Sequence, residues 1–200
     1  LGMLMTSDQP EAEEAEPPVE YWKMFDINPG GDNGRPEDFA ELNGVLYFQA
    51  DDGTNGEELW KYDADTGTAS LVDNIRDGSE GSYPSDLTVL DGVMYFRAND
   101  GTNGSELWKY DPNDGPGGTT SLVDDIYDGS EGSNPYYHTV LDGVLYFSAN
   151  DGMKGTELWK YDPTDGLGGT ASLVVDIYDG SSSSYPLDLT VLDGVLYFSA

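Results

Sequence analysis

The chain has 200 residues, with 39 acidic side chains against 8 basic ones and a formal net charge of −31 at pH 7. This charge repels phosphate backbones and anionic lipid, so we expect no nucleic-acid partner. There is no cysteine, which excludes disulfides and thiol chemistry, and no apolar run approaches the roughly 20 residues of a transmembrane helix, so we expect no membrane insertion.

The first 19 residues differ from the rest of the chain. Residues 1–7 read LGMLMTS and are extended and apolar, whereas residues 8–20 are acidic and rich in proline, a composition typical of disorder. We expect residues 1–19 to form an extended arm with a linker. The sequence opens on Leu1 without an initiating Met, which favours a mature exported chain and predicts an extracellular or cell-surface location.

Residues 20–200 repeat one unit. The phrases GVLYFQA, GVMYFRA, GVLYFSA and GVLYFSA recur, and so do ELWKYD and SLVDNIRDG with small changes. The repeats cover residues 38–79, 86–128 and 137–179, and a fourth, incomplete unit combines residues 20–27 with 187–200. We therefore expect a single domain built from copies of one unit.

Each unit is predicted to hold four strands, because apolar residues alternate with period two between Gly, Pro, Asn and Asp turns. In the third unit these strands cover residues 137–141, 144–149, 157–161 and 171–178. Asp142-Gly143 between the first two is a two-residue hairpin signal. Both strand faces are apolar, which indicates sheets covered on both sides. The expected fold is all-β, a β-propeller of about four blades of four antiparallel strands, one blade being shared by the chain ends; a solenoid is the alternative.

The repeated motif resembles a known family. Asp100-Gly101, Gly104, Glu106-Leu107-Trp108 and Asp111 are similar to the bacterial ELW-x-x-D-G-T repeat. The resemblance implies an exported or cell-surface repeat protein with a propeller-like fold and no established catalytic role. The segments YDPNDGPGGT and YDPTDGLGGT depart from the family pattern by inserted residues.

The fourth unit lacks its third strand, the ELW strand, and the remaining extended apolar segment is residues 1–7. Three alternatives follow: this segment closes its own blade, it enters the open blade of a neighbouring copy and builds a head-to-tail filament, or the chain continues past Ala200. The second makes copies of the protein its partners. The predicted assembly residues are Leu1, Met3, Leu4, Met5, Leu196 and Phe198.

Acidic turns offer oxygen ligands that suit Ca²⁺, although none matches the twelve-residue calcium loop. The candidate calcium ligands are Asp51, Asp100, Asp111, Asp114, Asp151 and Asp162. The rival interpretation is that Asp, Asn and Gly are simply what turns require. Asp38, Asp86 and Asp188 align at the start of the first strand, the third unit having Tyr137 instead. One interpretation is a ring that holds a cation at a channel mouth; the favoured one is that they cap backbone amides or face water.

Other recurring polar residues are interpreted as scaffold. Glu58, Glu106 and Glu157 occur once per unit, whereas catalytic carboxylates form an asymmetric pair. His138 aligns with apolar residues and is interpreted as a packing residue, so we expect no enzyme. The sequence predicts an extracellular structural protein that assembles into a filament or surface layer. The alternative is a calcium-dependent adhesion protein, or one that binds glycans through Tyr83, Tyr136, Tyr137 and Tyr185.

Overall fold

The computed structural model describes residues 26–31, 33–166 and 168–200, and this part of the chain consists of strands and turns. No helix in it is long and apolar enough to cross a membrane. The arm predicted over residues 1–19 lies outside the described residues.

In the described part of the chain, fourteen strands form four antiparallel sheets in chain order, three with four strands and one with two. The first sheet contains β1 (Glu37–Leu42), β2 (Val45–Asp51), β3 (Glu57–Asp63) and β4 (Thr68–Asp73). The second contains β5 (Ser85–Leu90), β6 (Val93–Asn99), β7 (Ser105–Asp111) and β8 (Thr119–Asp124). The third contains β9 (Tyr136–Leu141), β10 (Val144–Asn150), β11 (Thr156–Asp162) and β12 (Thr170–Val175), and the fourth contains β13 (Leu187–Leu192) and β14 (Val195–Ser199).

Within each complete sheet, every strand pairs with the next one along the chain. The first two strands are joined by the predicted two-residue turns, and in the second sheet Asp91 and Gly92 have φ values of 50° and 78°. Positive φ at both positions gives a turn whose twist matches that of the flanking strands. The prediction of repeated four-stranded antiparallel sheets is confirmed.

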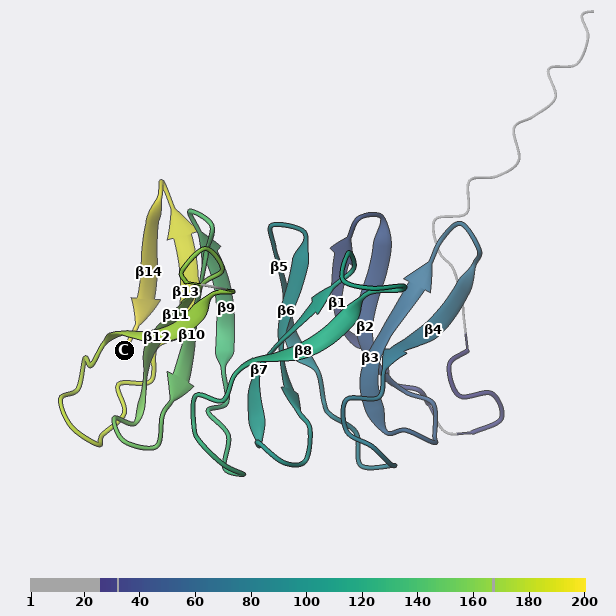
Figure 1. Cartoon of the computed structure of the whole chain (residues 1–200), viewed down its shortest axis with the longest axis horizontal. Helices are drawn as coiled ribbons and strands as arrows, with labels where there is room; N and C mark the ends of the chain where they lie inside the picture. Colours follow the sequence, from purple (N-terminus) through teal and green to yellow (C-terminus); the bar gives the residue numbers. More distant parts are fainter. Residues whose placement is uncertain (1–25, 32, 167) are drawn as a thin grey trace, which may run out of the picture.

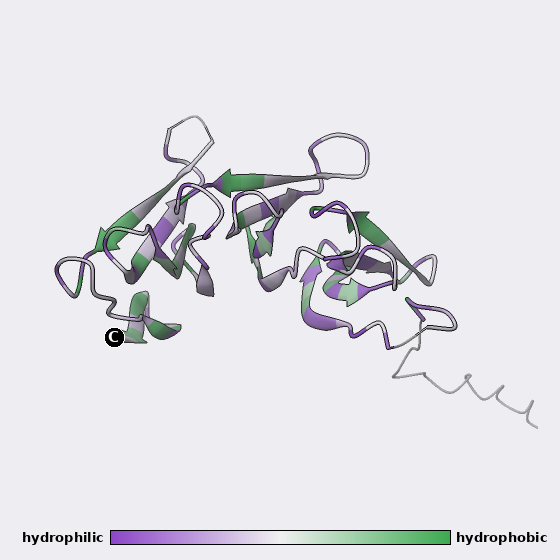
Figure 2. Cartoon of the chain, turned by 90° about the horizontal axis from the view of Figure 1, so that it is seen from below, coloured by the Kyte–Doolittle hydropathy of each residue, from purple (hydrophilic) through white to green (hydrophobic). Residues whose placement is uncertain are grey.

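The sheets stand side by side (Figure 1), and seen from below they follow an open arc with the first sheet at one end and the β13–β14 hairpin at the other (Figure 2). The first strands β1, β5, β9 and β13 are neighbours along this arc. A closed ring with a blade shared by the two chain ends stays a prediction, because residues 20–25 lie outside the described residues.

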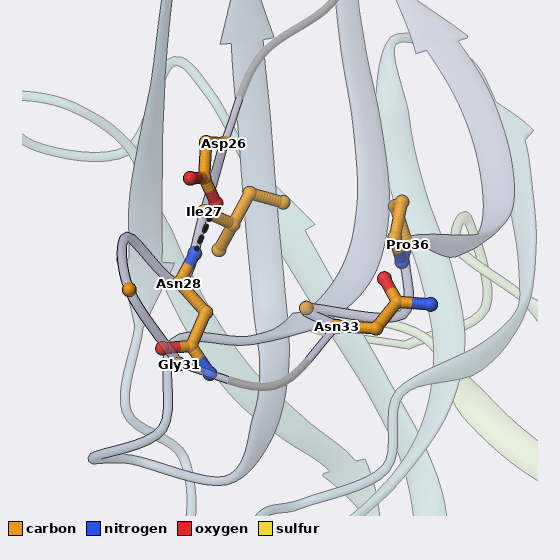
Figure 3. A pocket seen from close by; sticks show the side chains of 8 residues that line it. Asp26, Ile27, Asn28, Gly31, Asn33 and Pro36 are labelled. Atoms are coloured by element: carbon orange, nitrogen blue, oxygen red, sulfur yellow. Dashed lines mark hydrogen bonds between the residues drawn. The ribbon is translucent and has the colours of Figure 1, made fainter.

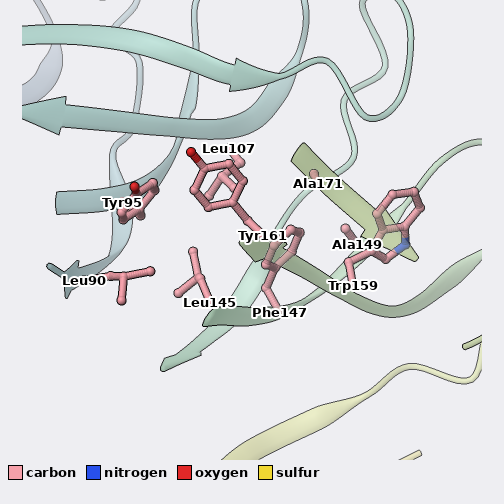
Figure 4. Close-up of a cluster of buried hydrophobic side chains, with 9 residues drawn as sticks. All are labelled: Leu90, Tyr95, Leu107, Leu145, Phe147, Ala149, Trp159, Tyr161 and Ala171. Atoms are coloured by element: carbon pink, nitrogen blue, oxygen red, sulfur yellow. The ribbon is translucent and has the colours of Figure 1, made fainter. Parts of the chain in front are cut away.

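The core lies between neighbouring sheets. On the second strand of each unit, the tyrosine points toward the next repeat and the phenylalanine that follows it points toward the preceding repeat. Tyr95 of the second sheet packs with Leu145 and Phe147 of the third in one buried cluster (Figure 4). Tyr47 packs in the same way with Phe96 of the second sheet. Every interface between complete sheets therefore uses the same positions of the repeat.

Candidate functional site

We call the first strand of each sheet (β1, β5, β9 and β13) its inner strand. Aspartates near the starts of these strands link neighbouring sheets. Asp38, Asp86, Tyr137 and Asp188 all have positive φ values between 50° and 60°, next to a shift in strand register. An Asp38 carboxylate oxygen accepts the Asp86 N–H at 3.2 Å, and Asp86 accepts the Tyr137 N–H at 3.0 Å. The interpretation that these carboxylates cap backbone amides is confirmed for Asp38 and Asp86. Asp188 has no following repeat within the described chain.

His138 follows Tyr137 on β9 and contacts the backbone of Asp86. Its Nδ1 lies 2.9 Å from the Asp86 carbonyl oxygen, and its ring meets the Phe147 ring edge-on with centroids 5.8 Å apart. Within the described chain, its buried Nε2 has no hydrogen-bond partner. Burial lowers the pKa of His138 to about 4, opposed by the bond to Asp86, so the ring is neutral at pH 7. A neutral ring packed at an apolar position agrees with its interpretation as a packing residue.

A buried glutamate holds each loop that leads from one sheet to the next. The carboxylate of Glu106 accepts the N–H groups of Ile126, Tyr127 and Ser133, and the Ser133 hydroxyl as well. Burial raises the pKa of Glu106 to about 7, against the effect of these hydrogen bonds. Glu58 and Glu157 hold the corresponding serines, Ser82 and Ser184, in the same way. The three equivalent carboxylates each accept several hydrogen bonds from the loop that they hold, which agrees with their interpretation as scaffold.

The six candidate calcium ligands occupy five turns, Asp111 and Asp114 sharing one, and most of them bond to amides of their own loop. Asp100 accepts the N–H groups of Thr102 and Asn103, and Asp151 does the same in the third repeat. Asp51, Asp111 and Asp162 each accept the N–H group two residues ahead. Asp114 is part of the turn after β7, where its carbonyl oxygen accepts a hydroxyl bond.

These contacts are what the turn interpretation requires. Among the described residues, no group of three or more His, Cys, Asp or Glu side chains is arranged to hold a metal ion. Calcium binding at these loops stays a prediction. The repeat alignment also shows that the counterpart of Asp100 and Asp151 in the first unit is Asp52, which accepts the same bonds, rather than Asp51.

A scan of protein-family models finds none that matches this chain, and a search of curated proteins finds no significant relative.

The C-terminal end of the arc carries the strongest departure from the repeat. Residues 143–149 and 194–200 have the identical sequence GVLYFSA, but Phe147 is fully buried whereas Phe198 is 36% exposed. Tyr197 is 51% exposed, compared with 3% for Tyr95. Leu196 and Phe198, two of the predicted assembly residues, both lie on β14. The others, Leu1, Met3, Leu4 and Met5, lie outside the described residues.

Two hollows mark the described surface. One, of about 330 Å³, lies in the loop over residues 26–36, where the Asn28 N–H donates to Asp26 at 3.1 Å (Figure 3). Glycine and asparagine dominate its lining, and its described residues include no pair of groups suited to acid–base chemistry. The other, of about 320 Å³, lies beside β9, and three of the four tyrosines proposed for glycan contact line it: Tyr136, Tyr137 and Tyr185.

Proposed function

We propose that this protein is a self-assembling structural subunit, and that its incomplete fourth sheet accepts a strand from a neighbouring copy. The observation that carries the proposal is the identical heptapeptide of residues 143–149 and 194–200. Its residues 145 and 147–149 are buried in the third sheet, whereas all of residues 194–200 except the half-buried Leu196 are exposed in the fourth. Since the two segments have the same sequence, the difference in burial reflects what covers them.

The free edge of β14 supports strand addition. In the complete sheets, the second strand pairs on both sides, and Phe48, Phe96 and Phe147 each stand opposite a tryptophan of the third strand. Within the described residues, β14 pairs with β13 alone, so Phe198 faces no such tryptophan. An unpaired strand edge presents a row of backbone donors and acceptors, which is the template for adding another strand.

An apolar surface adjoins this edge. Ile75 and Ile126 follow β4 and β8 and pack against the core of the next sheet, whereas the corresponding Ile177 is exposed. Six apolar residues at this end of the chain are exposed: Val175, Ile177, Leu192, Val195, Tyr197 and Phe198. The adjacent Tyr197 and Phe198 point to opposite faces of β14. Large apolar side chains exposed in such number mark interaction sites in soluble proteins.

The repeats themselves indicate which partner fits. The positions of Leu192 and Tyr197 correspond to Leu90 and Tyr95, which the next repeat of this same chain covers. Two interfaces within the chain bury this surface against another repeat. The surface is therefore complementary to a repeat of this type. A second copy therefore fits better than an unrelated partner. Head-to-tail contacts between such copies extend into a filament.

The donated strand is proposed to be residues 1–7 of the neighbouring copy, with Leu1, Met3, Leu4 and Met5 packing against Leu196 and Phe198. Such a subunit is expected outside the cell, in a filament or surface layer. This location also agrees with the resemblance of its repeats to the ELW-x-x-D-G-T family.

Electron microscopy and light scattering test the proposal. We expect the full chain to form filaments, and both Phe198→Asp and a chain starting at Glu20 to remain monomeric, because a buried aspartate or a missing strand removes the contact. Met153→Asp is the matched control, since Met153 is exposed in a loop away from β14, and it should assemble normally. Monomers of the full chain, or filaments that survive both changes, would contradict strand donation.

A further inference from the structure

In a chain of near-identical repeats, the positions that differ are informative, and several of them meet at one place. The segment that leads into the first strand reads Tyr-Pro-Ser-Asp-Leu in the second unit and Tyr-Pro-Leu-Asp-Leu in the fourth, whereas the third unit reads Asn-Pro-Tyr-Tyr-His over residues 134–138. Asn134, Tyr136 and Tyr137 line the cavity of about 320 Å³ beside β9. Tyr185 of the next repeat faces the same cavity.

The cavity is open because of a second substitution in the third unit. At the position of Ser148, the second unit has Arg97, whose guanidinium lies 4.2 Å from the centroid of the Tyr136 ring. Arg97 also donates hydrogen bonds to the hydroxyls of Ser85 and Tyr136, and so fills the space between the second and third sheets. Ser148 is too short to reach across, and the equivalent space beyond it stays empty of protein atoms.

The lining combines aromatic rings with neutral hydrogen-bonding groups. Tyr136, Tyr137 and Tyr185 are all exposed, so their ring faces or edges are accessible. The hydroxyls of Ser148 and Thr156 also line the cavity, and neither side chain makes a hydrogen bond within the described chain. Pockets of roughly 300–1,000 Å³ with aromatic walls and a few polar groups are the usual form of small-molecule sites.

The charge of the lining selects the kind of ligand. Among the residues that the structure describes, neither a carboxylate nor a lysine or arginine lines the cavity. A bound cation would lack a counter-ion there, and an anion would be repelled by a chain with a net charge of −31. A neutral molecule with both apolar faces and hydroxyl groups satisfies the rings and the hydroxyls together, because a ring face excludes water while a hydroxyl hydrogen-bonds.

From this combination we infer that the cavity between the third sheet and β13 binds a neutral saccharide. A pyranose ring presents a face of C–H groups that stacks on tyrosine, and an edge of hydroxyls that pairs with Ser148, Thr156 and the Asn134 amide oxygen. This site is separate from strand donation, since its aromatic residues precede or begin the inner strands whereas assembly uses the β14 edge.

The test is calorimetric titration of the full chain with four neutral oligosaccharides: tetramers of β-1,4-glucose, α-1,4-glucose, β-1,3-glucose and β-1,4-N-acetylglucosamine. We expect at least one to bind, and Ser148→Arg to weaken it at least tenfold by filling the cavity as Arg97 does. Gln49→Arg places the same side chain at the same position of the first sheet and should leave affinity unchanged.

The thermal midpoint of Ser148→Arg checks that this variant folds. A second pair of variants tests the site independently of it. Tyr185→Ala should lower affinity at least tenfold, whereas Tyr83→Ala, at the equivalent position before β5, should not. Failure of all four sugars to bind would overturn the inference, and so would binding that both site variants leave intact. Binding of tetramethylammonium or of an oligogalacturonate in their place would also overturn it. Light scattering of the same samples reports assembly separately.

Discussion

A single side chain shows how the repeats tolerate local change. His138 stands where the other units have Phe39, Leu87 and Leu189, and it keeps the packing role of those residues while adding one hydrogen bond to Asp86. That role was predictable from the alignment alone. The unpaired buried Nε2 was not, because it depends on which atoms of the neighbouring sheet approach the ring.

His138→Leu should change how stability depends on pH. The folded-state pKa of about 4 lies below the ordinary value of 6.5, so the stability that neutral His138 contributes is present above pH 6.5 and is lost as pH falls toward 4. The leucine variant lacks this loss and should gain up to roughly 3 kcal/mol relative to the natural chain between pH 7 and pH 4.

Urea unfolding of both proteins across this range measures the effect. The difference between the two free energies of unfolding removes the background of shared carboxylates. Curves that stay parallel from pH 7 to pH 4 would show that His138 is protonated as easily in the folded as in the unfolded chain.

At the scale of elements, the strands were predicted within a few residues and the loops were not. The fourth strand of the third unit was expected to reach residue 178 but ends at Val175. The Ile177 N–H donates to the buried Glu157 carboxylate at 2.9 Å instead of to a neighbouring strand. The periodicity of the sequence does not predict this bond, because a glutamate next to a leucine in a strand is equally typical of an exposed position.

The turn between the second and third strands is pressed against the loop that leads to the next sheet. Gly104 has a φ of 72°, and a Cβ there would lie 2.5 Å from the Gly132 backbone nitrogen. The same contact joins Gly56 to Gly81 in the first unit. Only residues without a side chain allow this backbone approach at positive φ.

Gly104→Ala should therefore be more destabilising than an ordinary glycine replacement. Gly92→Ala is the control, since Gly92 also has positive φ but a Cβ there meets nothing within 4 Å. We expect a loss of about 1–2 kcal/mol for the control, and about 1–3 kcal/mol more for Gly104→Ala because of the clash. Equal losses in denaturant unfolding would mean that the loop moves aside freely.

At the scale of the whole molecule, charge opposes the association that we propose for the open end of the arc. Each copy has a net charge of −31, so two copies repel each other at low ionic strength. The composition predicted this property directly. The open end itself was predicted only from the missing third strand, and the arc between the ends depends on the angle between sheets, which no local pattern encodes.

Assembly should consequently increase with salt. The screening length falls from about 10 Å at 0.1 M to about 3 Å at 1 M, which weakens repulsion between copies while leaving apolar contacts at Phe198 intact. Light scattering of the full chain in rising sodium chloride should show larger particles, and Phe198→Asp should show none at any concentration. Particles that dissolve as salt rises would point to ionic rather than apolar contacts.

The contact between Arg97 and Tyr136 has a consequence for folding. Because the repeats share their core residues, a strand of one unit fits the sheet of another almost as well, and such chains are prone to misassembly between neighbours. Arg97 and Tyr136 occur once each at their positions, and their hydrogen bond forms only when the second unit lies beside the third. The contact therefore stabilises the pairing of the second sheet with the third relative to pairings between other, near-identical repeats.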